Sequence, residues 1–293
     1  MYAARIIARQ GKTYIVEDQS SHQHQCHARS QTMDAVCGDH VSCQPQESSL
    51  DVIEEILPRQ NQITRVDNFK RKKTLAANID HMLILISPIP EFSTLLIDKY
   101  LACAQLNHCK ASIIINKSEL IYSHGVKLNQ LESIYKDLVK YFIVASAKLG
   151  YGISTLRKAL SNETSILVGQ SGVGKSSIIN RLLNSNDIKV NTVSDQIQQG
   201  RHTTSNAYAY PINDCGNIID SPGVRTFTPA FADQDELVSG FAEFEPFTGK
   251  CKFNDCKHLD EPDCAVRQAV SENIIHPSRY DNYLQIRREL PEL

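Results

Sequence analysis

The 293-residue sequence lacks the features of a membrane or exported protein. It contains no run of about 18 consecutive apolar residues, which is the length that a membrane-spanning helix needs. Its first five residues, MYAAR, do not follow the basic-then-apolar plan of a secretory signal. We therefore expect a soluble, cytoplasmic protein with no membrane partner.

The sequence also has little net charge and no disulfide pattern. The formal net charge is −2, so any RNA binding must come from local patches rather than from the field of the whole molecule. The number of cysteines, nine, is odd, and most of them are scattered, which is unlike a disulfide framework. The scattered ones are Cys26, Cys37, Cys43, Cys103, Cys109 and Cys215.

In its other proportions, the sequence has the composition of an ordinary globular protein. Hydrophobic residues make up 41% of the chain and charged residues 22%, and the length suffices for two or three folding units, each with its own core. Nothing in the sequence points to a subunit interface. We therefore expect a monomer with more than one domain.

Short apolar runs separated by turns occupy residues 1–66, which we predict to be the first domain. Five such strands in this space fit an oligonucleotide-binding (OB) β-barrel, and an SH3-like barrel would give much the same pattern. The five runs are 5–9, 13–16, 22–28, 39–43 and 52–57.

A group of histidines and a basic stretch near these strands can each be interpreted as ordinary surface or as a binding site. His22, His24 and His27 alternate with glutamine beside Cys26, which favours the polar face of an exposed strand over a metal site. The basic stretch between residues 65 and 73 fits a solvated linker and a phosphate contact equally well.

Continuous apolar strands alternate with helical patterns from residue 81 onward. Strands of this kind are buried on both faces of a parallel sheet, so we predict a doubly wound α/β domain over residues 67–230. The strands expected are 82–86, 112–115, 142–144, 166–168 and 217–219. After residue 230 the strand signal stops, and we predict a third, helical domain over residues 231–293.

A complete phosphate-loop motif follows one predicted strand and precedes a helical pattern. Residues 169–176 read GQSGVGKS and match G-x-x-x-x-G-K-[ST]. Backbone N–H groups of such a loop surround phosphates, Lys175 neutralises the β- and γ-phosphates, and the Ser176 hydroxyl binds Mg²⁺. The nucleotide-binding residues predicted here are Gly169, Gln170, Ser171, Gly172, Val173, Gly174, Lys175, Ser176 and Ser177.

Residues downstream complete a metal and γ-phosphate site. Asp220 follows a predicted strand, where its carboxylate can hold the Mg²⁺ shell, and the Gly223 N–H can face the γ-phosphate. Thr203 or Thr204 supplies a further hydroxyl to Mg²⁺, and the sequence does not choose between them. His202 is the candidate that positions water, the alternative being a solvent-exposed histidine. The predicted catalytic residues are Lys175, His202 and Asp220.

Two short motifs after predicted strands fit the recognition of guanine. The first is Asn116, Lys117, Ser118 and Glu119, and the second is Ser146, Ala147 and Lys148. A carboxylate at position 119 accepts hydrogen bonds from the ring N–H and the exocyclic amine of guanine, which adenine does not offer in that arrangement. We therefore predict GTP rather than ATP as the ligand.

Three cysteines and a histidine lie within fourteen residues near the C-terminus. Three thiolates and an imidazole form a tetrahedral ligand set suited to one structural zinc ion, and four protein ligands leave no open position for catalysis. The alternative is a group of reduced, unliganded cysteines. The four residues are Cys251, Cys256, His258 and Cys264.

The motifs resemble those of TRAFAC-class GTPases, but here the guanine motifs precede the phosphate loop, so the order is circularly permuted. With the β-rich N-terminal unit and the C-terminal Cys/His cluster, this order resembles the ribosome small subunit-dependent GTPase A (RsgA/YjeQ-like) family over essentially the whole chain. Two features depart from the expected pattern. Position 119 is Glu rather than Asp, and Gln196, Gln198 and Gln199 stand where basic residues are expected.

The resemblance implies a GTPase that matures the small ribosomal subunit at a late stage and binds its rRNA, with hydrolysis stimulated by the subunit and coupled to release. Val224 cannot orient water as a glutamine does, so we expect slow intrinsic hydrolysis. Because Asp220 leads directly into the C-terminal unit, nucleotide state can reposition that unit. The alternatives are a GTPase with another RNA partner and a non-catalytic RNA-binding module that holds GTP.

Overall fold

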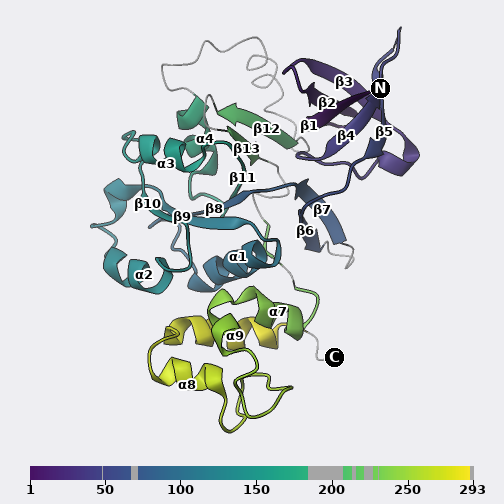
Figure 1. The fold of residues 1–293 in the computed structure, drawn as a ribbon. Coiled ribbons are helices and arrows are strands. Elements are labelled where there is room, and N and C mark those ends of the chain that lie inside the picture. Colours follow the sequence, from purple (N-terminus) through teal and green to yellow (C-terminus); the bar gives the residue numbers. More distant parts are fainter. Residues whose placement is uncertain are drawn as a thin grey trace.

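Three parts follow one another along the chain in the computed structural model (Figure 1). A group of strands comes first, a sheet flanked by helices follows, and a group of helices ends the chain. The structure describes residues 1–47, 49–66, 72–183, 207–212, 216–220, 227–229 and 231–290. The domain limits at residues 66/67 and 230/231 stay predictions.

The first five strands close into a barrel. They pair in the order β1-β2-β3-β5-β4, and β4 returns to pair with β1. Apolar side chains alternate toward the interior, so that Ala4, Ile6 and Ala8 of β1 are buried while their neighbours are less so. This is the five-stranded barrel of the OB class. The strands are β1 (Tyr2–Gln10), β2 (Thr13–Asp18), β3 (Gln23–Ala28), β4 (His40–Gln44) and β5 (Asp51–Ile56), with a 3-10 turn at Ser30–Thr32.

The central sheet has the strand order β10-β9-β8-β11-β13-β12. The first five of these strands run parallel, and β12 is antiparallel to β13. Every residue of β8 and β11 is buried, as the continuous apolar runs predicted for a sheet covered on both faces. The strands are β8 (His81–Ile86), β9 (Lys110–Ile115), β10 (Tyr141–Val144), β11 (Glu163–Val168), β12 (Ala207–Ile212) and β13 (Gly216–Asp220).

Helices cover both faces of this sheet. Alternate residues of β8 point to opposite sides, so Ile84 packs in one apolar cluster with α1 and α2, whereas Leu85 packs in another with α3 and α4. The doubly wound α/β fold is thereby confirmed. The helices are α1 (Thr94–Leu106), α2 (Leu128–Tyr135), α3 (Ile153–Ala159) and α4 (Lys175–Leu183), with a 3-10 turn at Ser118–Leu120.

Strand β12 joins the barrel to the central sheet. Ala8 and Arg9 of β1 pair with Tyr208 and Ala207 of β12, so the two sheets are continuous. Strand β12 was not predicted from the sequence, and it contains Pro211, a residue that weakens a strand assignment. Strand β12 pairs with β1 only through Ala207 and Tyr208, so on the β1 side no ladder hydrogen bond is needed at Pro211. The strand can therefore contain this proline.

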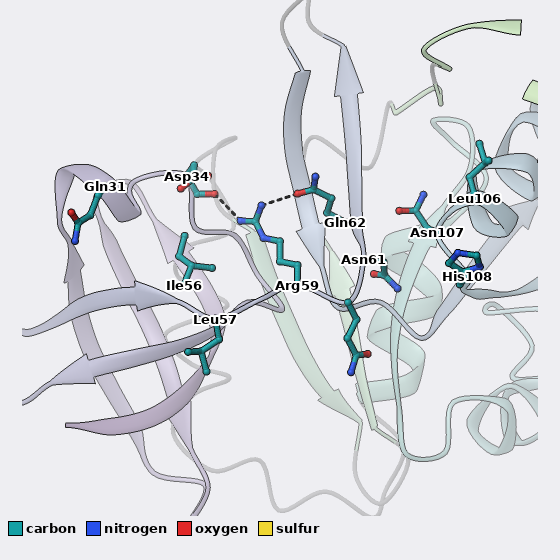
Figure 2. A pocket seen from close by; sticks show the side chains of 11 residues that line it. Gln31, Asp34, Ile56, Leu57, Arg59, Asn61, Gln62, Leu106, Asn107 and His108 are labelled. Atoms are coloured by element: carbon teal, nitrogen blue, oxygen red, sulfur yellow. Dashed lines mark hydrogen bonds between the residues drawn. The ribbon is translucent and has the colours of Figure 1, made fainter. Parts of the chain in front are cut away.

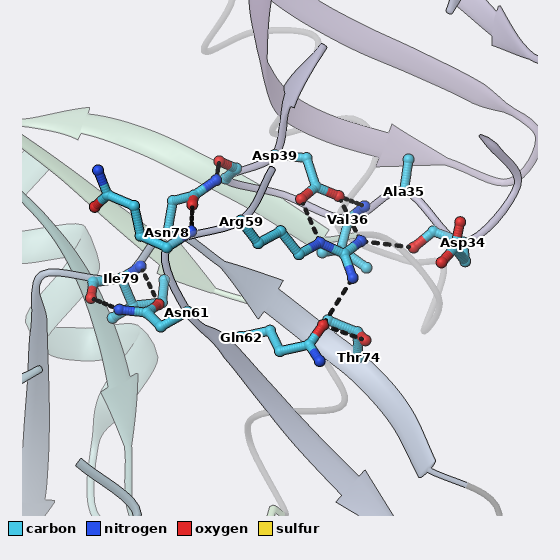
Figure 3. Close-up of polar contacts among 12 residues, drawn as sticks. Asp34, Ala35, Val36, Asp39, Arg59, Asn61, Gln62, Thr74, Asn78 and Ile79 are labelled. Carbon is cyan, nitrogen blue, oxygen red and sulfur yellow. Dashed lines mark hydrogen bonds and ion pairs between the residues drawn. The ribbon is translucent and has the colours of Figure 1, made fainter. Parts of the chain in front are cut away.

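A hairpin that was not predicted from the sequence connects the barrel to β8. Its strands are β6 (Gln62–Val66) and β7 (Lys72–Ala77). Arg59, just before the hairpin, donates to both carboxylate oxygens of buried Asp39 at 2.7 and 2.9 Å and to Oε1 of Gln62 at 2.8 Å (Figure 3). These bonds fix the hairpin against the barrel.

Helices α7 and α9 of the C-terminal part pack on α1 (Figure 1), and α8 packs on α9. Arg279 contacts Asp98 of α1 at 2.6 Å and Glu243 at 2.6 Å, and the Asn282 amide donates to Asp98 at 2.7 Å. None of the helices among the described residues is long and apolar enough to cross a membrane. The C-terminal helices are α7 (Gln234–Gly240), α8 (Ala265–Ser271) and α9 (Pro277–Arg288), with a 3-10 segment at Ala242–Phe247.

Candidate nucleotide and metal sites

The predicted nucleotide motifs meet at one edge of the central sheet. Asn116 follows β9, Ser146 follows β10, Gly169 follows β11 and Asp220 ends β13. These strands run parallel in the order β10-β9-β8-β11-β13, with β8 between β9 and β11. Their carboxyl ends therefore lie at the same edge, which is where open α/β sheets bind ligands. The topology therefore brings together motifs that are far apart in the sequence.

The phosphate loop has the backbone that its glycines allow. Gly169, Gly172 and Gly174 have φ angles of 137°, 84° and 99°, which side-chain-bearing residues rarely adopt. The buried Lys175 begins α4, and its ammonium group donates to the carbonyl oxygens of Gly169 at 2.6 Å and Gln170 at 2.7 Å. The lysine thus lies across the loop whose backbone amides are expected to hold phosphates. Ser176 and Ser177 follow in the first turn of α4, and both are exposed.

Asn116 links both guanine motifs to the phosphate loop. Its Nδ2 donates to the carbonyl oxygen of Val173 at 2.9 Å, and its Oδ1 accepts from the N–H of Ala147 at 3.0 Å. The fit is tight, because a Cβ added to Gly174 would lie 2.3 Å from Asn116 Nδ2. The buried Asn116 therefore fixes three loops relative to one another.

Lys117 and Glu119 lie beside this link. Lys117 Nζ donates to Gly172 O at 2.8 Å and to Ile89 O at 2.6 Å. The Ile89 carbonyl comes from the loop after β8, which the sequence did not mark as part of the site. Ser146 donates its hydroxyl hydrogen to Glu119 at 2.6 Å and accepts from the N–H of Leu149. The bond from Ser146 lowers the pKa of the Glu119 carboxyl.

The remaining predicted residues divide into those that the structure describes and those that lie outside it. Ser118 donates its N–H to Ala145 O at 3.0 Å, and Lys148 is exposed. Asp220 is 6% exposed at the end of β13. Outside the described residues lie His202, Thr203, Thr204, Gly223, Val224, Gln196, Gln198 and Gln199.

The four predicted zinc ligands converge on one point. One ligand atom from each of Cys251, Cys256, His258 and Cys264 lies within 4.8 Å of all the others. His258 Nδ1 is 3.6, 3.5 and 3.4 Å from the sulfur atoms of the three cysteines, and the Cys251 and Cys264 sulfur atoms are 3.9 Å apart. These residues form a possible metal site that the chain folds around.

Surrounding residues hold the cluster in place. Glu261 accepts the N–H groups of Lys257 and Leu259 on either side of His258, both at 2.7 Å. Tyr280 of α9 donates to the carbonyl oxygen of His258 at 2.7 Å. The cluster is therefore tied to the helix that packs on α1. The eight cysteines that the structure describes are all free thiols, in keeping with the absence of a disulfide pattern.

A separate cavity lies where the barrel, the linker before β6 and the end of α1 meet (Figure 2). Its lining is mostly polar and rich in side-chain amides, and Arg59 within it is already bound to Asp39. None of the predicted nucleotide or metal residues lines it. The lining residues are Gln31, Asp34, Ile56, Leu57, Arg59, Gln60, Asn61, Gln62, Leu106, Asn107 and His108.

Known proteins are similar in sequence over nearly the whole chain. The chain is 38% identical to the small ribosomal subunit biogenesis GTPase RsgA of Saccharophagus degradans, over 99% of this chain and 88% of that protein. It is also 38% identical to the protein of the same name from Haemophilus influenzae strain PittGG, over 94% of this chain and 82% of that protein.

Two solved structures are similar in fold. YjeQ from Thermotoga maritima has a TM-score of 0.79 and 31% identity, with 99% of this chain and 98% of that chain covered. YloQ, described as a circularly permuted GTPase, has a TM-score of 0.73 and 26% identity, with 100% and 97% covered. The permuted order predicted from the motifs is thereby confirmed. The model of the RsgA GTPase family matches residues 56–229, and the chain therefore belongs to the RsgA GTPase family.

Proposed function

We propose that this protein hydrolyses GTP as a late maturation factor of the small ribosomal subunit. The observation that carries the proposal is the contact of Asn116 with Val173 and Ala147, which assembles guanine-reading and phosphate-binding loops into one site. The near full-length similarity to proteins named for small-subunit biogenesis supplies the partner. We place the protein in the cytoplasm and take it to act as a monomer.

The geometry of the loops supports the following nucleotide roles. The Glu119 carboxylate, which its bond with Ser146 keeps ionised, accepts the two N–H donors of guanine. The Ala147 N–H donates to the guanine carbonyl, and the Lys117 stem covers the ring face. The backbone amides of residues 169–177 hold the phosphates, and Lys175 moves from its loop carbonyls to the β- and γ-phosphates.

Mg²⁺ fits the oxygen groups at this edge of the sheet. Ser176 is the second residue of α4, and Asp220 ends β13, the strand that pairs with β11 before the phosphate loop. A hydroxyl and a carboxylate, which are hard ligands of the kind that Mg²⁺ prefers, thus come from elements at one edge of the sheet. The ion neutralises charge on the β- and γ-phosphates when it is bound. Thr203 or Thr204 as a further ligand, the Gly223 N–H at the γ-phosphate, and His202 as the residue that positions water remain part of the proposal.

The cysteine and histidine cluster has the dimensions of a zinc site. Zinc–sulfur bonds of about 2.3 Å and zinc–nitrogen bonds of about 2.05 Å, at tetrahedral angles, place sulfur about 3.5 Å from nitrogen and about 3.8 Å from sulfur. In the cluster, His258 Nδ1 lies 3.4–3.6 Å from each sulfur atom, the Cys251 and Cys264 sulfur atoms are 3.9 Å apart, and all four ligand atoms lie within 4.8 Å of one another. We infer one structural zinc ion, with all four protein ligands engaged.

The barrel supplies the proposed RNA contact. OB-type barrels bind oligonucleotides on their strand faces and loops, and this barrel is joined to the GTPase sheet through β1 and β12. With little net charge on the whole chain, binding depends on docking surfaces rather than on long-range attraction. Hydrolysis is slow in the free protein and faster on the subunit, and it releases the factor.

Turnover of GTP and ATP by the purified protein, with and without isolated small ribosomal subunits, tests this proposal. We expect GTP-selective turnover that small subunits accelerate and large subunits do not. Acceleration by a different RNA particle would identify another partner. Slow turnover that no particle accelerates would favour a GTP-holding RNA-binding module, and equal use of ATP would contradict the role of Glu119.

A further inference from the structure

The hairpin β6–β7 carries positive side chains opposite one another on its two strands. Arg65 pairs with Lys73, and Lys72 follows opposite Val66. Like charges directly opposite each other destabilise an antiparallel pair. Within the part of the chain that the structure describes, no carboxylate forms an ion pair with any of the three, both lysines are exposed, and Nε of Arg65 has no hydrogen-bond partner. A bound polyanion would offset this repulsion.

The hairpin lies outside both larger sheets, because among the described strands β6 and β7 pair only with each other (Figure 1). At its base, the hydroxyl of Thr74 and Nη1 of Arg59 both donate to Oε1 of Gln62, at 3.4 and 2.8 Å (Figure 3). Side chains two positions apart on a strand share a face, so Lys72 is on the face of Thr74. The hairpin therefore begins at the rim of the polar cavity, which Gln62 lines (Figure 2).

The cavity has the size and the chemistry of a site for a nucleobase. Its volume of about 660 Å³ lies in the range of roughly 300–1,000 Å³ that is typical of ligand pockets. Amide groups both donate and accept hydrogen bonds, as the edges of bases do, and apolar side chains beside them can cover the face of a base. The amide side chains are Gln31, Gln60, Asn61, Gln62 and Asn107, and the apolar ones are Ile56, Leu57 and Leu106.

Phosphate groups fit this cavity less well than bases do. No lysine is among the described residues that line it, and its arginine, Arg59, already binds both carboxylate oxygens of Asp39. Asp34 adds an exposed negative charge to the lining. The side chain of Gln60 is exposed and forms no hydrogen bond with another described residue, so its amide is available to a ligand.

We propose that the β6–β7 hairpin and the cavity at its base bind a single-stranded segment of RNA, at a site apart from the strand faces of the barrel. Arg65, Lys72 and Lys73 contact the phosphates, and the cavity takes an unpaired base. A single strand is required because the bases of a duplex are already paired and stacked, whereas unpaired bases can turn outward into a protein pocket. The proposal rests on the RNA partner of the proposed function and gives that partner a second site.

Binding of a labelled strand of ten uridines by the full chain tests the contribution of the hairpin. The variant Lys72→Gln/Lys73→Gln should bind it about tenfold more weakly at low salt. The slope of log affinity against log salt should become shallower by about 1.4, since each phosphate contact of a single strand contributes about 0.7. The matched control is Lys127→Gln/Lys136→Gln, which removes two exposed lysines at the two ends of α2. It should keep the affinity and the slope of the wild type.

The variant Gln60→Ala tests the cavity. We expect the affinity for the uridine strand to fall severalfold, because uracil offers both donors and acceptors to an amide. Its affinity for inorganic polyphosphate should stay that of the wild type, whereas the lysine double variant should lose affinity for both ligands. All of these variants should keep the basal GTP turnover, which also shows that they are folded.

Three results would overturn the proposal: a wild type that does not bind the strand, a lysine double variant with unchanged affinity, or Gln60→Ala with equal losses for RNA and polyphosphate. Competition by oligoglutamate as strong as that by RNA would assign the hairpin to an acidic protein instead. GTP turnover with small ribosomal subunits tests the proposed function separately. Binding of the strand that depends on Lys72 and Lys73, without stimulation by subunits, would support the RNA site and contradict the ribosomal role.

Discussion

The side-chain amide of Asn116 lies 2.9 Å from the carbonyl oxygen of Val173, 57 positions later in the sequence. The same side chain accepts the N–H of Ala147, so one residue sets the distance between the guanine end and the phosphate end of the site. A nucleotide that contacts both ends binds with full strength only when these loops are already in place, because ordering them on binding costs free energy.

Replacing Asn116 with alanine should weaken GTP and GDP binding together, by about tenfold or more, since both nucleotides need the same spacing of loops. Titration with a fluorescent GDP analogue, and competition by GTP, measures this. The control is Asn107→Ala, because the Asn107 amide also donates to a backbone carbonyl, that of Cys103, at 2.8 Å. Equal affinities in the two variants would contradict the bridging role.

Replacing Glu119 with glutamine should lower the affinity for GTP by about tenfold to a hundredfold, because an amide accepts only one of the two guanine N–H groups and its own N–H opposes the other. The variant should gain affinity for xanthosine triphosphate, whose carbonyl accepts that N–H. Glu119→Asp should keep guanine selectivity. Competition titrations compare the nucleotides, and Glu132→Gln, a change at an exposed carboxylate on α2, should leave the ranking unchanged.

We expect the wild type to retain about one zinc ion per chain and Cys256→Ser to retain none. Because structural zinc sites contribute directly to folding, the variant should also unfold between Phe247 and Ala265, the residues that hold the cluster. Atomic absorption measures the metal, and a chelator should lower the unfolding temperature of the wild type but hardly that of the variant. Cys109→Ser, which alters a thiol outside the cluster, should keep its zinc. Zinc retained by Cys256→Ser would refute the assignment.

The burial of His81 should make the free energy of unfolding fall at acid pH. It is fully buried, with Ser112 Oγ 2.7 Å from Nε2 and Glu163 2.8 Å from Nδ1, and Lys110 and Lys140 also contact Glu163. Burial lowers the pKa of His81, so its contribution to stability is complete above the unfolded pKa of about 6.5 and is lost as pH falls below it.

Urea unfolding at several pH values between about 5 and 7.5 checks this expectation. As the pH falls through that range, the free energy of unfolding should decrease more steeply in the wild type than in His81→Gln. The two slopes should differ by at most about 1.4 kcal/mol per pH unit, the limit for the uptake of one proton. His108→Gln, at an exposed histidine, should keep the slope of the wild type. Parallel slopes for the wild type and His81→Gln would show that other groups cause the acid sensitivity.

The sequence by itself determined the chemistry of the sites and the class of the fold. Gly169 and Gly174 predict a phosphate loop because few other residues adopt the backbone that such a loop needs, and Cys251 and Cys264 predict a metal because thiolates and an imidazole so closely spaced suit few other ligands. The continuous apolar runs likewise predicted the parallel sheet, because strands covered on both faces carry apolar side chains on both.

Only the tertiary structure decided how distant segments meet. The pairing of Ala8 with Tyr208, which joins the barrel to the sheet, leaves no mark in local composition, since backbone hydrogen bonds between strands are made by almost any residue. The same holds for the carbonyl group of Ile89, which accepts a hydrogen bond from Lys117. Every residue offers such a group, and its use depends on which side chain the fold brings beside it.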